Sequence, residues 1–199
     1  FDDVESTDPG LRIGGLTTLR FLDEVLDLPE FSKALSVEYG LNVRNSLSLS
    51  NFLKQTNGRS SVLICLLALN PTVTTFASFD KISLQTYLTQ RDPDDQVADI
   101  FFTEPIDLAF ESVGRSPKDL PIVCVAAAKT AEGKLNLAFG GCERTDFIRL
   151  EPNQTDVSEL VSKIYSGATD QWASEEYRVS AGEVLLRRAL QKISLTSES

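Results

Sequence analysis

The side chains that could carry out chemistry are few in this chain and widely spaced. There is no histidine, which removes the commonest general base and the commonest zinc ligand. The cysteines Cys65, Cys124 and Cys142 form no CxxC pair, and the first two lie in the apolar runs VLICLLAL and PIVCVAAA. Since a thiol in such a run behaves as a small buried hydrophobe, we expect no metal site, no cysteine nucleophile and a reducing, cytoplasmic setting.

The other polar clusters favour structural roles. Neighbouring acidic residues at 94–95 and 175–176 would point apart in a strand or helix, so solvated carboxylates are expected rather than an acid–base pair. A nucleophile at Ser60-Ser61 would need a lysine base in the absence of histidine, and Lys54 sits at no diagnostic spacing. Catalytic residues are therefore not predicted.

Three features could instead touch a ligand. The stretch NVRNSLSLSNFL at 42–53 begins like a phosphate-cradling turn, but Ser50-Asn51-Phe52 stands where glycines would be needed. Either a ligand is held unusually there or a binding site has been dismantled. Gly140-Gly141 is typical of a tight turn, or of a backbone that approaches a ligand. Trp172 is expected to be a packing anchor rather than a stacking platform.

Composition limits the partners. A net charge of −10 and an isoelectric point near 4.5 argue against nucleic acid, because phosphate contacts need clustered Lys and Arg. The longest apolar run, 62–69, is far shorter than the roughly 18 residues of a membrane span. The acidic first ten residues carry no signal-peptide pattern, and the chain contains no methionine. We therefore treat it as the remainder of a longer polypeptide.

Hydrophobic periodicity and capping signals divide the chain into an α+β half and a half of antiparallel strands followed by helices. In the first half we expect strands at 11–15 and 72–79, helices at 17–28 (capped by Thr17), 29–40 and 82–88, and charged or polar turns around 57–58 and 91–96. In the second half we expect strands at 106–113, 121–130, 134–142 and 145–152 with a hairpin turn at 131–133, then helices from Thr155 or Asp156 to 167 and at 183–193 behind a Ser or Gly cap. The fold class is α+β.

Several segments together resemble one family. LRIGGLTTL, the 42–74 segment, DLPIVCVAAA followed by GKLNLAFGGC, and ASEEYRVSAGEVLLRRAL are similar to the FAD-binding medium subunit of molybdenum hydroxylases such as carbon monoxide dehydrogenase and xanthine dehydrogenase. The resemblance implies the second subdomain of the FAD-binding (PCMH-type) fold at about 1–106 and a CO-dehydrogenase-flavoprotein C-terminal domain at about 107–199, with the Gly-rich subdomain upstream. It also implies FAD as the cofactor, and iron–sulfur and molybdopterin subunits or a second copy as partners.

Departures from this family lie where it holds FAD. Its Thr-Leu-Gly-Gly-Asn is replaced by Ser48-Leu49-Ser50-Asn51-Phe52, so side chains at Ser50 and Asn51 crowd the approach that glycine allows, and Phe52 removes a polar group. Its Ser-Pro-x-Ser-Asp becomes the segment from Asn57 to Ser61, with Ser61 in place of the aspartate. The family's ring-facing lysine aligns with Glu111, a charge reversal worth on the order of 1–4 kcal/mol beside a flavin.

Three hypotheses follow. In the first, a flavin-subunit-like protein has lost the family's usual FAD binding and serves as a structural or interaction module. In the second, a working FAD subunit of an oxidoreductase passes electrons between an iron–sulfur partner and NAD or another acceptor. In the third, a repurposed pocket takes another nucleotide or a small acid, with Arg59, Ser60, Ser61 and Arg115 as hydrogen-bond donors.

Overall fold

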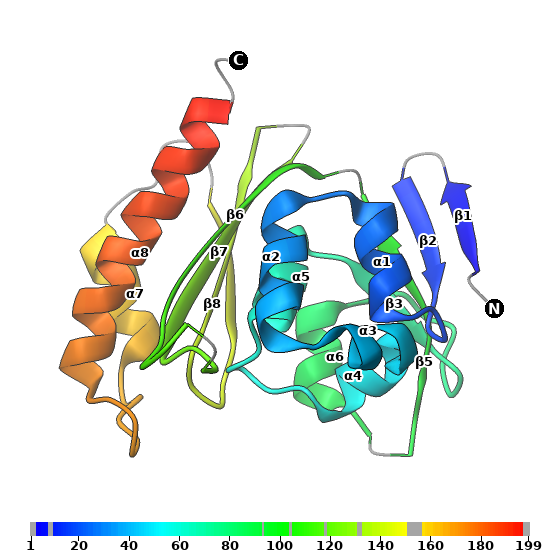
Figure 1. The fold of residues 1–199 in the computed structure, drawn as a ribbon, viewed down its shortest axis with the longest axis horizontal. Coiled ribbons are helices and arrows are strands. Elements are labelled where there is room, and N and C mark those ends of the chain that lie inside the picture. Colours follow the sequence, from blue (N-terminus) through cyan, green and yellow to red (C-terminus); the bar gives the residue numbers. More distant parts are fainter. Residues whose placement is uncertain are drawn as a thin grey trace.

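The computed structural model describes residues 3–7, 10–92, 94–103, 105–117, 119–130, 133–150 and 157–196. Two antiparallel sheets stand side by side with helices between them and a pair of helices on the outer face of the second sheet (Figure 1). The α+β architecture with antiparallel sheets is as predicted. The expected turn at Ala131-Glu132 and the expected cap at Thr155 or Asp156 lie outside the described residues.

The first sheet has the strand order β1-β2-β5-β3-β4. Its strands are β1 Val4–Thr7, β2 Gly10–Gly14, β3 Thr72–Thr75, β4 Ile82–Ser83 and β5 Val97–Phe102. Strands at 11–15 and 72–79 were predicted, but the central strand β5 and the edge strand β1 were not. The short segment VADIFF of β5 directly follows the charged 91–96 turn, and its pairing with β2 and β3 identifies it as a strand.

The helices of this half are α1 Leu19–Leu26, α2 Pro29–Glu38, α3 Leu41–Ser46, α4 Leu49–Gln55, α5 Ser61–Leu69 and α6 Leu84–Gln90. The prediction of Thr17 as a cap is wrong by one residue, because Thr18 accepts the Phe21 N–H while the buried Thr17 hydroxyl has no partner. The polar 45–61 segment holds α4, with Ser48 as its N-cap, which its composition did not reveal. The helix expected at 82–88 starts two residues late because Ile82 and Ser83 pair with β3.

Helix α5 lies at the centre of the molecule. All nine of its residues, SVLICLLAL, are buried, as expected for a helix that is apolar on every side. One side packs on α2 and another on strands β6, β7 and β8 of the second sheet. The hydrophobic cluster around α5 therefore contains side chains from both halves of the chain, including Phe110, Cys124 and Ala138.

The second sheet has the order β6-β7-β8-β9, with β6 Pro105–Val113, β7 Val123–Thr130, β8 Leu135–Gly140 and β9 Asp146–Leu150. These are the four strands that were predicted. Its outer face is covered by α7 Val157–Tyr165 and α8 Glu175–Thr196, which form a second hydrophobic cluster with it. Since helices cover both faces, the first six residues of β7 are all buried, and its sequence reads as a continuous apolar run.

Helix α8 begins eight residues before the predicted start at 183, behind Ser174, whose hydroxyl accepts the Tyr177 N–H. Gly182, considered as a cap, lies inside the helix. A Cβ at Gly182 would be 2.8 Å from the Tyr165 ring, so the glycine permits α8 to pack closely against α7. Tertiary packing therefore carries the helix through a residue that is a weak helix former.

Candidate functional site

The start of α4, where the resemblance places cofactor-binding glycines, is folded against the loop before α1. Ser48 caps the helix by accepting the Asn51 N–H at 3.3 Å. The Ser50 N–H donates to the Gly15 carbonyl at 2.8 Å, and the Ser50 side chain is buried without a hydrogen-bond partner. The backbone donor of Ser50 is therefore used within the protein, and Asn51 alone of these three is exposed.

Phe52 is a core residue. Its side chain is completely buried in the cluster around α5. It meets the Tyr39 ring edge-on, with centroids 6.1 Å apart and an interplanar angle of 85°, a favoured aromatic geometry. Phe52, at the position where the resemblance places an amide, is thus an apolar anchor that faces the interior.

The segment from Asn57 to Ser61 forms the turn into α5. The Asn57 side chain accepts the Arg59 N–H at 3.0 Å, and Ser60 caps the helix by accepting the Leu63 N–H at 3.1 Å. Ser61 is buried at the first turn. The candidate residues Asn57 and Ser61 therefore lie within one tight turn. Their side chains nevertheless line two different cavities of the protein.

A carboxylate of the protein itself occupies the N-terminus of α5. Glu38, at the end of α2, accepts the Val62 N–H at 3.1 Å. Burial raises the pKa of Glu38, and the hydrogen bonds from Ser60 and from the Val62 N–H offset part of that rise. Free N–H groups at the start of a helix attract anions. Glu38 occupies this position in α5, where an external phosphate or carboxylate could otherwise bind.

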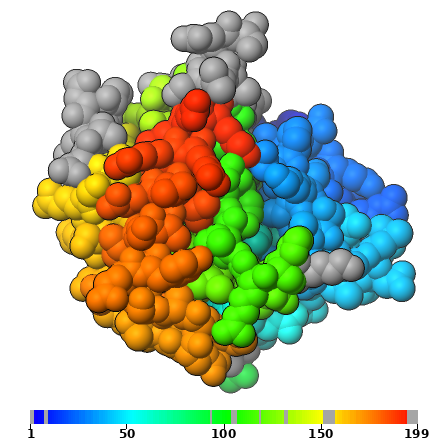
Figure 2. All heavy atoms as spheres, turned by 60° about the vertical axis from the view of Figure 1, so that its left-hand side comes forward, coloured from blue at the N-terminus to red at the C-terminus, as the bar shows by residue number. Residues whose placement is uncertain are grey.

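Glu111 does not stand as an isolated negative charge. The Lys192 amine of α8 lies 2.7 Å from its carboxylate and 3.4 Å from that of Glu30 on α2. The hydrogen bond with Glu111 is the main cause that raises the pKa of Lys192. Figure 2 shows β6 and the residues that follow it, in green, between α8 and the blue N-terminal helices, and Lys192 bridges these elements. Sequence reasoning missed Lys192 because nothing in a helical Lys indicates which distant carboxylate it meets.

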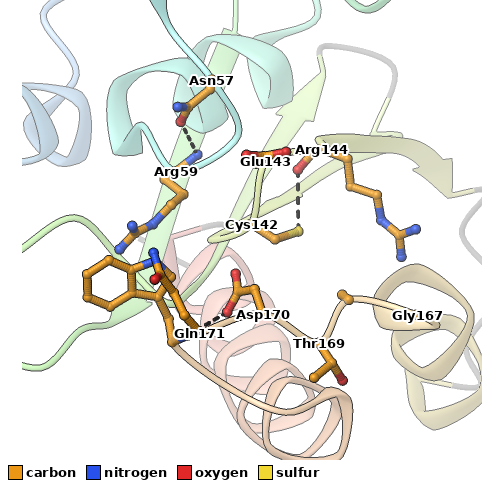
Figure 3. A pocket seen from close by; sticks show the side chains of 11 residues that line it. Asn57, Arg59, Cys142, Glu143, Arg144, Gly167, Thr169, Asp170 and Gln171 are labelled. Carbon is orange, nitrogen blue, oxygen red and sulfur yellow. Dashed lines mark hydrogen bonds between the residues drawn. The ribbon is translucent and has the colours of Figure 1, made fainter.

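Cavities lie beside these residues, among them a small one of about 350 Å³ lined by Glu38 and Ser61 and two larger ones. The larger, about 660 Å³, is lined by Asn57, Arg59, Cys142–Arg144 and Gly167–Trp172. In Figure 3, Asn57 and Arg59 come from one side of it and Thr169, Asp170 and Gln171 from the opposite side. A second cavity of about 500 Å³ has Ser61, Glu111 and Arg115 in its wall.

The predicted cofactor positions are thus not brought together. Asn57 lines the larger cavity, whereas Ser61 and Glu111 line the second one. Ser48, Ser50, Asn51 and Phe52 line neither of the two. Neither cavity is therefore lined by all seven candidate residues, Ser48, Ser50, Asn51, Phe52, Asn57, Ser61 and Glu111.

Gly140 and Gly141 lie against the backbone of Gly58, and we call this contact the glycine junction. The Gly141 N–H donates to the Gly58 carbonyl at 2.7 Å, and the Gly58 N–H donates to the Glu143 carbonyl at 3.1 Å. A Cβ on Gly140 would lie 2.3 Å from the Gly58 oxygen. Gly141 has φ +101°, a conformation that favours glycine. The glycines form a turn as expected, and the backbone that approaches them belongs to the protein.

Arg178 supports this junction from inside α8. Its side chain is fully buried and donates to the carbonyls of Gly141, at 2.8 Å, and Ile122, and to the Asp170 carboxylate at 2.6 Å. Partial burial raises the pKa of Asp170, but hydrogen bonds from the Trp172 N–H and Arg178 outweigh it and lower that pKa overall. No sequence signal distinguished this arginine from others on the helix, although it lies within the segment EEYRV of the resemblance.

Trp172 lies beneath two arginines. The guanidinium carbon of Arg59 is 4.5 Å from the centroid of the indole ring, and that of Arg115 is 4.7 Å from it. The hypothesis of a repurposed pocket named Arg59, Ser60, Ser61 and Arg115 as donors. The two arginines contact the same ring, whereas Ser60 caps α5 and Ser61 lies in the wall of the second cavity.

The three cysteines are free and buried, and burial raises the pKa of each thiol. Within the described ranges, no helix is both long and apolar enough to cross a membrane. The same residues contain no cluster of three His, Cys, Asp or Glu side chains placed to hold a metal ion.

Comparison with solved structures identifies the fold. The chain matches a chain of reconstituted CO dehydrogenase from Oligotropha carboxidovorans with a TM-score of 0.76 and 16% identity, covering 96% of this chain and 77% of that one. It matches quinoline 2-oxidoreductase from Pseudomonas putida 86 with a TM-score of 0.73 and 16% identity, over 96% and 76% of the two chains. A CO dehydrogenase from Hydrogenophaga pseudoflava gives 0.69 and 13%, over 96% and 77%.

No protein-family model and no curated protein sequence matches the chain. At these identities the structural likeness shows a shared fold. This chain therefore has the fold of a chain found in CO dehydrogenases and in quinoline 2-oxidoreductase, in agreement with the architecture that the sequence resemblance implied.

Proposed function

We propose that this chain is a flavoprotein-subunit-like protein of the molybdenum hydroxylase type that has lost the family's usual FAD binding and acts as a structural or interaction module. The observation that carries the proposal is that the positions assigned to the cofactor are used for the protein's own packing and hydrogen bonding. The proposed units are 1–106 and 107–199.

The start of α4 supports the loss of cofactor binding. A flavin site of the family type needs backbone N–H groups that a ligand can reach, and the Ser50 N–H is already bonded to Gly15. The Ser50 side chain and the Phe52 ring fill buried space on the inner side of the helix. Opening a ligand surface there would cost the burial of a phenylalanine, about 3–5 kcal/mol.

Charges near the second cavity support the same conclusion. The N-terminus of α5 is neutralised by Glu38, so a phosphate placed there would meet a carboxylate instead of free N–H groups. Position 111, where the resemblance places the ring-facing lysine, carries a glutamate whose charge is neutralised by Lys192 of α8 at 2.7 Å, so no lysine at this position is left for a flavin ring.

An interaction role fits the exposed apolar side chains near the start of α4. Leu16, in the loop that bonds to Ser50, is 63% exposed, and Leu41 and Val43 on the adjacent helix α3 are 57% and 44% exposed. Such side chains favour contact with another protein surface. The partners proposed from the resemblance are iron–sulfur and molybdopterin subunits or a second copy of the chain.

The test is the visible absorption spectrum of the complete purified protein, followed by denaturation and assay of the supernatant for released flavin. We expect no flavin absorbance and no change in unfolding temperature on adding FAD. Flavin retained at a stoichiometry near one per chain would overturn the proposal. Light-scattering mass measurement tests the second-copy partner, and Leu41→Glu, with the exposed Val184→Glu on α8 as its matched control, should weaken any self-association through the α3 surface.

A further inference from the structure

The two arginines over Trp172 have no carboxylate partner among the described residues. Arg59 stacks on the ring and donates weakly to the Pro121 carbonyl at 3.4 Å and the Leu120 carbonyl at 3.3 Å. Arg115 is exposed, and the ring contact is the one interaction that the described part of the chain provides for it. In a protein of net charge −10, two arginines that contact one ring and form no ion pair within the described residues are unusual.

Acidic side chains line the cavities beside the arginines, Glu143 and Asp170 the larger one and Glu111 and Asp119 the second, but none of them forms an ion pair with Arg59 or Arg115 in the described structure. The Asp170 carboxylate, two residues before Trp172, is bound by Arg178 and by the Trp172 and Ala173 N–H groups. Asp119 belongs to the same loop as Arg115, yet no ion pair joins it to either arginine in the described structure. Within the described residues, the charge of Arg115 is therefore compensated by the π-face of the indole alone and that of Arg59 by the indole and two long hydrogen bonds to carbonyls, and a cation–π contact is weak at exposed sites.

Hydrogen-bonding capacity is also left over. A guanidinium group has five N–H donors in a planar fork that matches oxyanions. Within the described residues, none of the five N–H groups of Arg115 and neither N–H of Arg59 Nη1 donates a hydrogen bond, since the hydrogen bonds of Arg59 come from Nε and Nη2. Two forks directed around one ring provide the donors and the charge that a dianion requires.

Space for the rest of a ligand lies alongside. Arg59 and Trp172 line the 660 Å³ cavity, whose wall also offers the amide of Asn57. Arg115 lines the neighbouring 500 Å³ cavity together with Ser116. The cluster therefore stands between two cavities, each large enough for a small organic molecule.

From this geometry we propose that Arg59, Trp172 and Arg115 form a binding site for a phosphate dianion, with the larger cavity taking the organic part of a small phosphate ester. The residues Ser48, Ser50, Asn51 and Phe52 of the α4 segment line neither cavity, whereas Asn57, also assigned to FAD by the resemblance, lines the larger one.

The alternative role of the cluster is structural, in which the arginines only pin the 114–121 loop to the α7–α8 connection. That role predicts the loss of a packing contact when an arginine is changed, but no response to phosphate. The two roles are separated by a ligand titration rather than by a stability measurement.

Trp172 is the only tryptophan of the chain, so intrinsic fluorescence reports directly on this site. The 199-residue chain would be titrated with inorganic phosphate and with glycerol phosphate, using sodium chloride at matched ionic strength as the reference. The variant is Arg115→Gln, whose exposed side chain can be removed without disturbing the core. The matched control is Arg20→Gln, an exposed arginine on α1 that pairs with Glu24.

We expect a saturable fluorescence change with phosphate, absent with chloride, that requires at least about tenfold more phosphate in Arg115→Gln and is unchanged in Arg20→Gln. Arg115→Lys should fall between, because an ammonium supplies charge without the fork. A tighter response to glycerol phosphate than to phosphate supports use of the cavity. The absence of a phosphate response beyond that of chloride, or an equal response in Arg115→Gln, would overturn the proposal.

Discussion

The glycine junction and the start of α4 are two places where the sequence suggested close backbone approach, and they differ in what fills the space. At the junction the backbone of Gly58 lies against Gly140 and Gly141, and a Cβ on Gly141 would be 2.2 Å from the Ile122 oxygen. At the start of α4, Ser50 and Asn51 carry side chains without a clash, one turned inward and one toward solvent.

The difference shows what a glycine requirement means physically. Glycine is needed where another backbone must come within van der Waals contact, whether that group belongs to a ligand or to the protein. The junction keeps its glycines because the protein itself makes the approach. The α4 positions tolerate side chains, which fits a helix start that no external group has to reach.

Among the substitutions that test this comparison, Gly141→Ala has the largest expected effect on stability. The substitution places a Cβ against the Ile122 carbonyl at a residue with φ +101°, so we expect the free energy of unfolding to fall by about 4 kcal/mol or more, or no folded protein. Chemical denaturation followed by circular dichroism measures it. Gly40→Ala, where no atom lies within 4 Å of the added Cβ, is the control and should unfold like the wild type.

Phe52→Ala tests the other side of the comparison. If Phe52 is a core residue, truncation should cost about 3–4 kcal/mol of unfolding free energy, because a fully buried ring is removed beside Tyr39. The same denaturation experiment gives the value. A loss below about 1 kcal/mol would mean that the ring is not held by the core and would weaken the argument that this position is closed to a ligand.

Asp170→Asn tests the support that the Asp170–Arg178 pair gives to the glycine junction. It leaves Arg178 buried without a counterion, and we expect a loss of about 2 kcal/mol, reduced from the cost of a fully buried pair because Asp170 is partly exposed. Since the pKa of Asp170 is lowered in the folded state, its contribution is present above the unfolded pKa and is lost as the pH falls through the folded pKa.

Wild type and Asp170→Asn should therefore converge in stability on acidification. Unfolding measured from neutral to strongly acidic pH checks this, and a stability difference that stays constant over the whole range would contradict the role given to the carboxylate.

The smallest expected effect comes from restoring glycine at both Ser50 and Asn51. Each change should cost about 0.5 kcal/mol through lower helix propensity, and the double variant should still bind no FAD, because Phe52, Glu38 and the Glu111–Lys192 pair are unchanged. A thermal-shift titration with FAD is the measurement. Flavin binding by the double variant would show that two side chains alone had closed the site.

Much of the fold follows from local sequence. The second sheet was predicted strand by strand because each strand is a run of apolar or alternating residues set off by Gly or Pro. The errors fell where local signals were weak: β5 follows a charged turn, α4 is polar, and α8 continues past Gly182. In each case long-range pairing or packing decided the outcome, and neither is encoded at short range.

The candidate site was less predictable. The sequence identified which positions depart from the family pattern but not where those side chains go. Ser61 and Glu111 line one cavity, whereas Asn57 lines another. Glu38 neutralises the N-terminus of α5, and Lys192 neutralises Glu111. These arrangements depend on contacts between residues far apart in the chain.

By itself the sequence determined the α+β class, the apolar segments that become the core, and the absence of histidine chemistry, because these follow from composition and periodicity. Only the tertiary structure decided that α5 joins both halves in one core, that Gly140 and Gly141 contact Gly58, and that Arg59 and Arg115 both contact Trp172. These contacts are determined by how whole helices and strands pack, which places side chains to within about an ångström. The spacing of residues along the sequence does not reveal them.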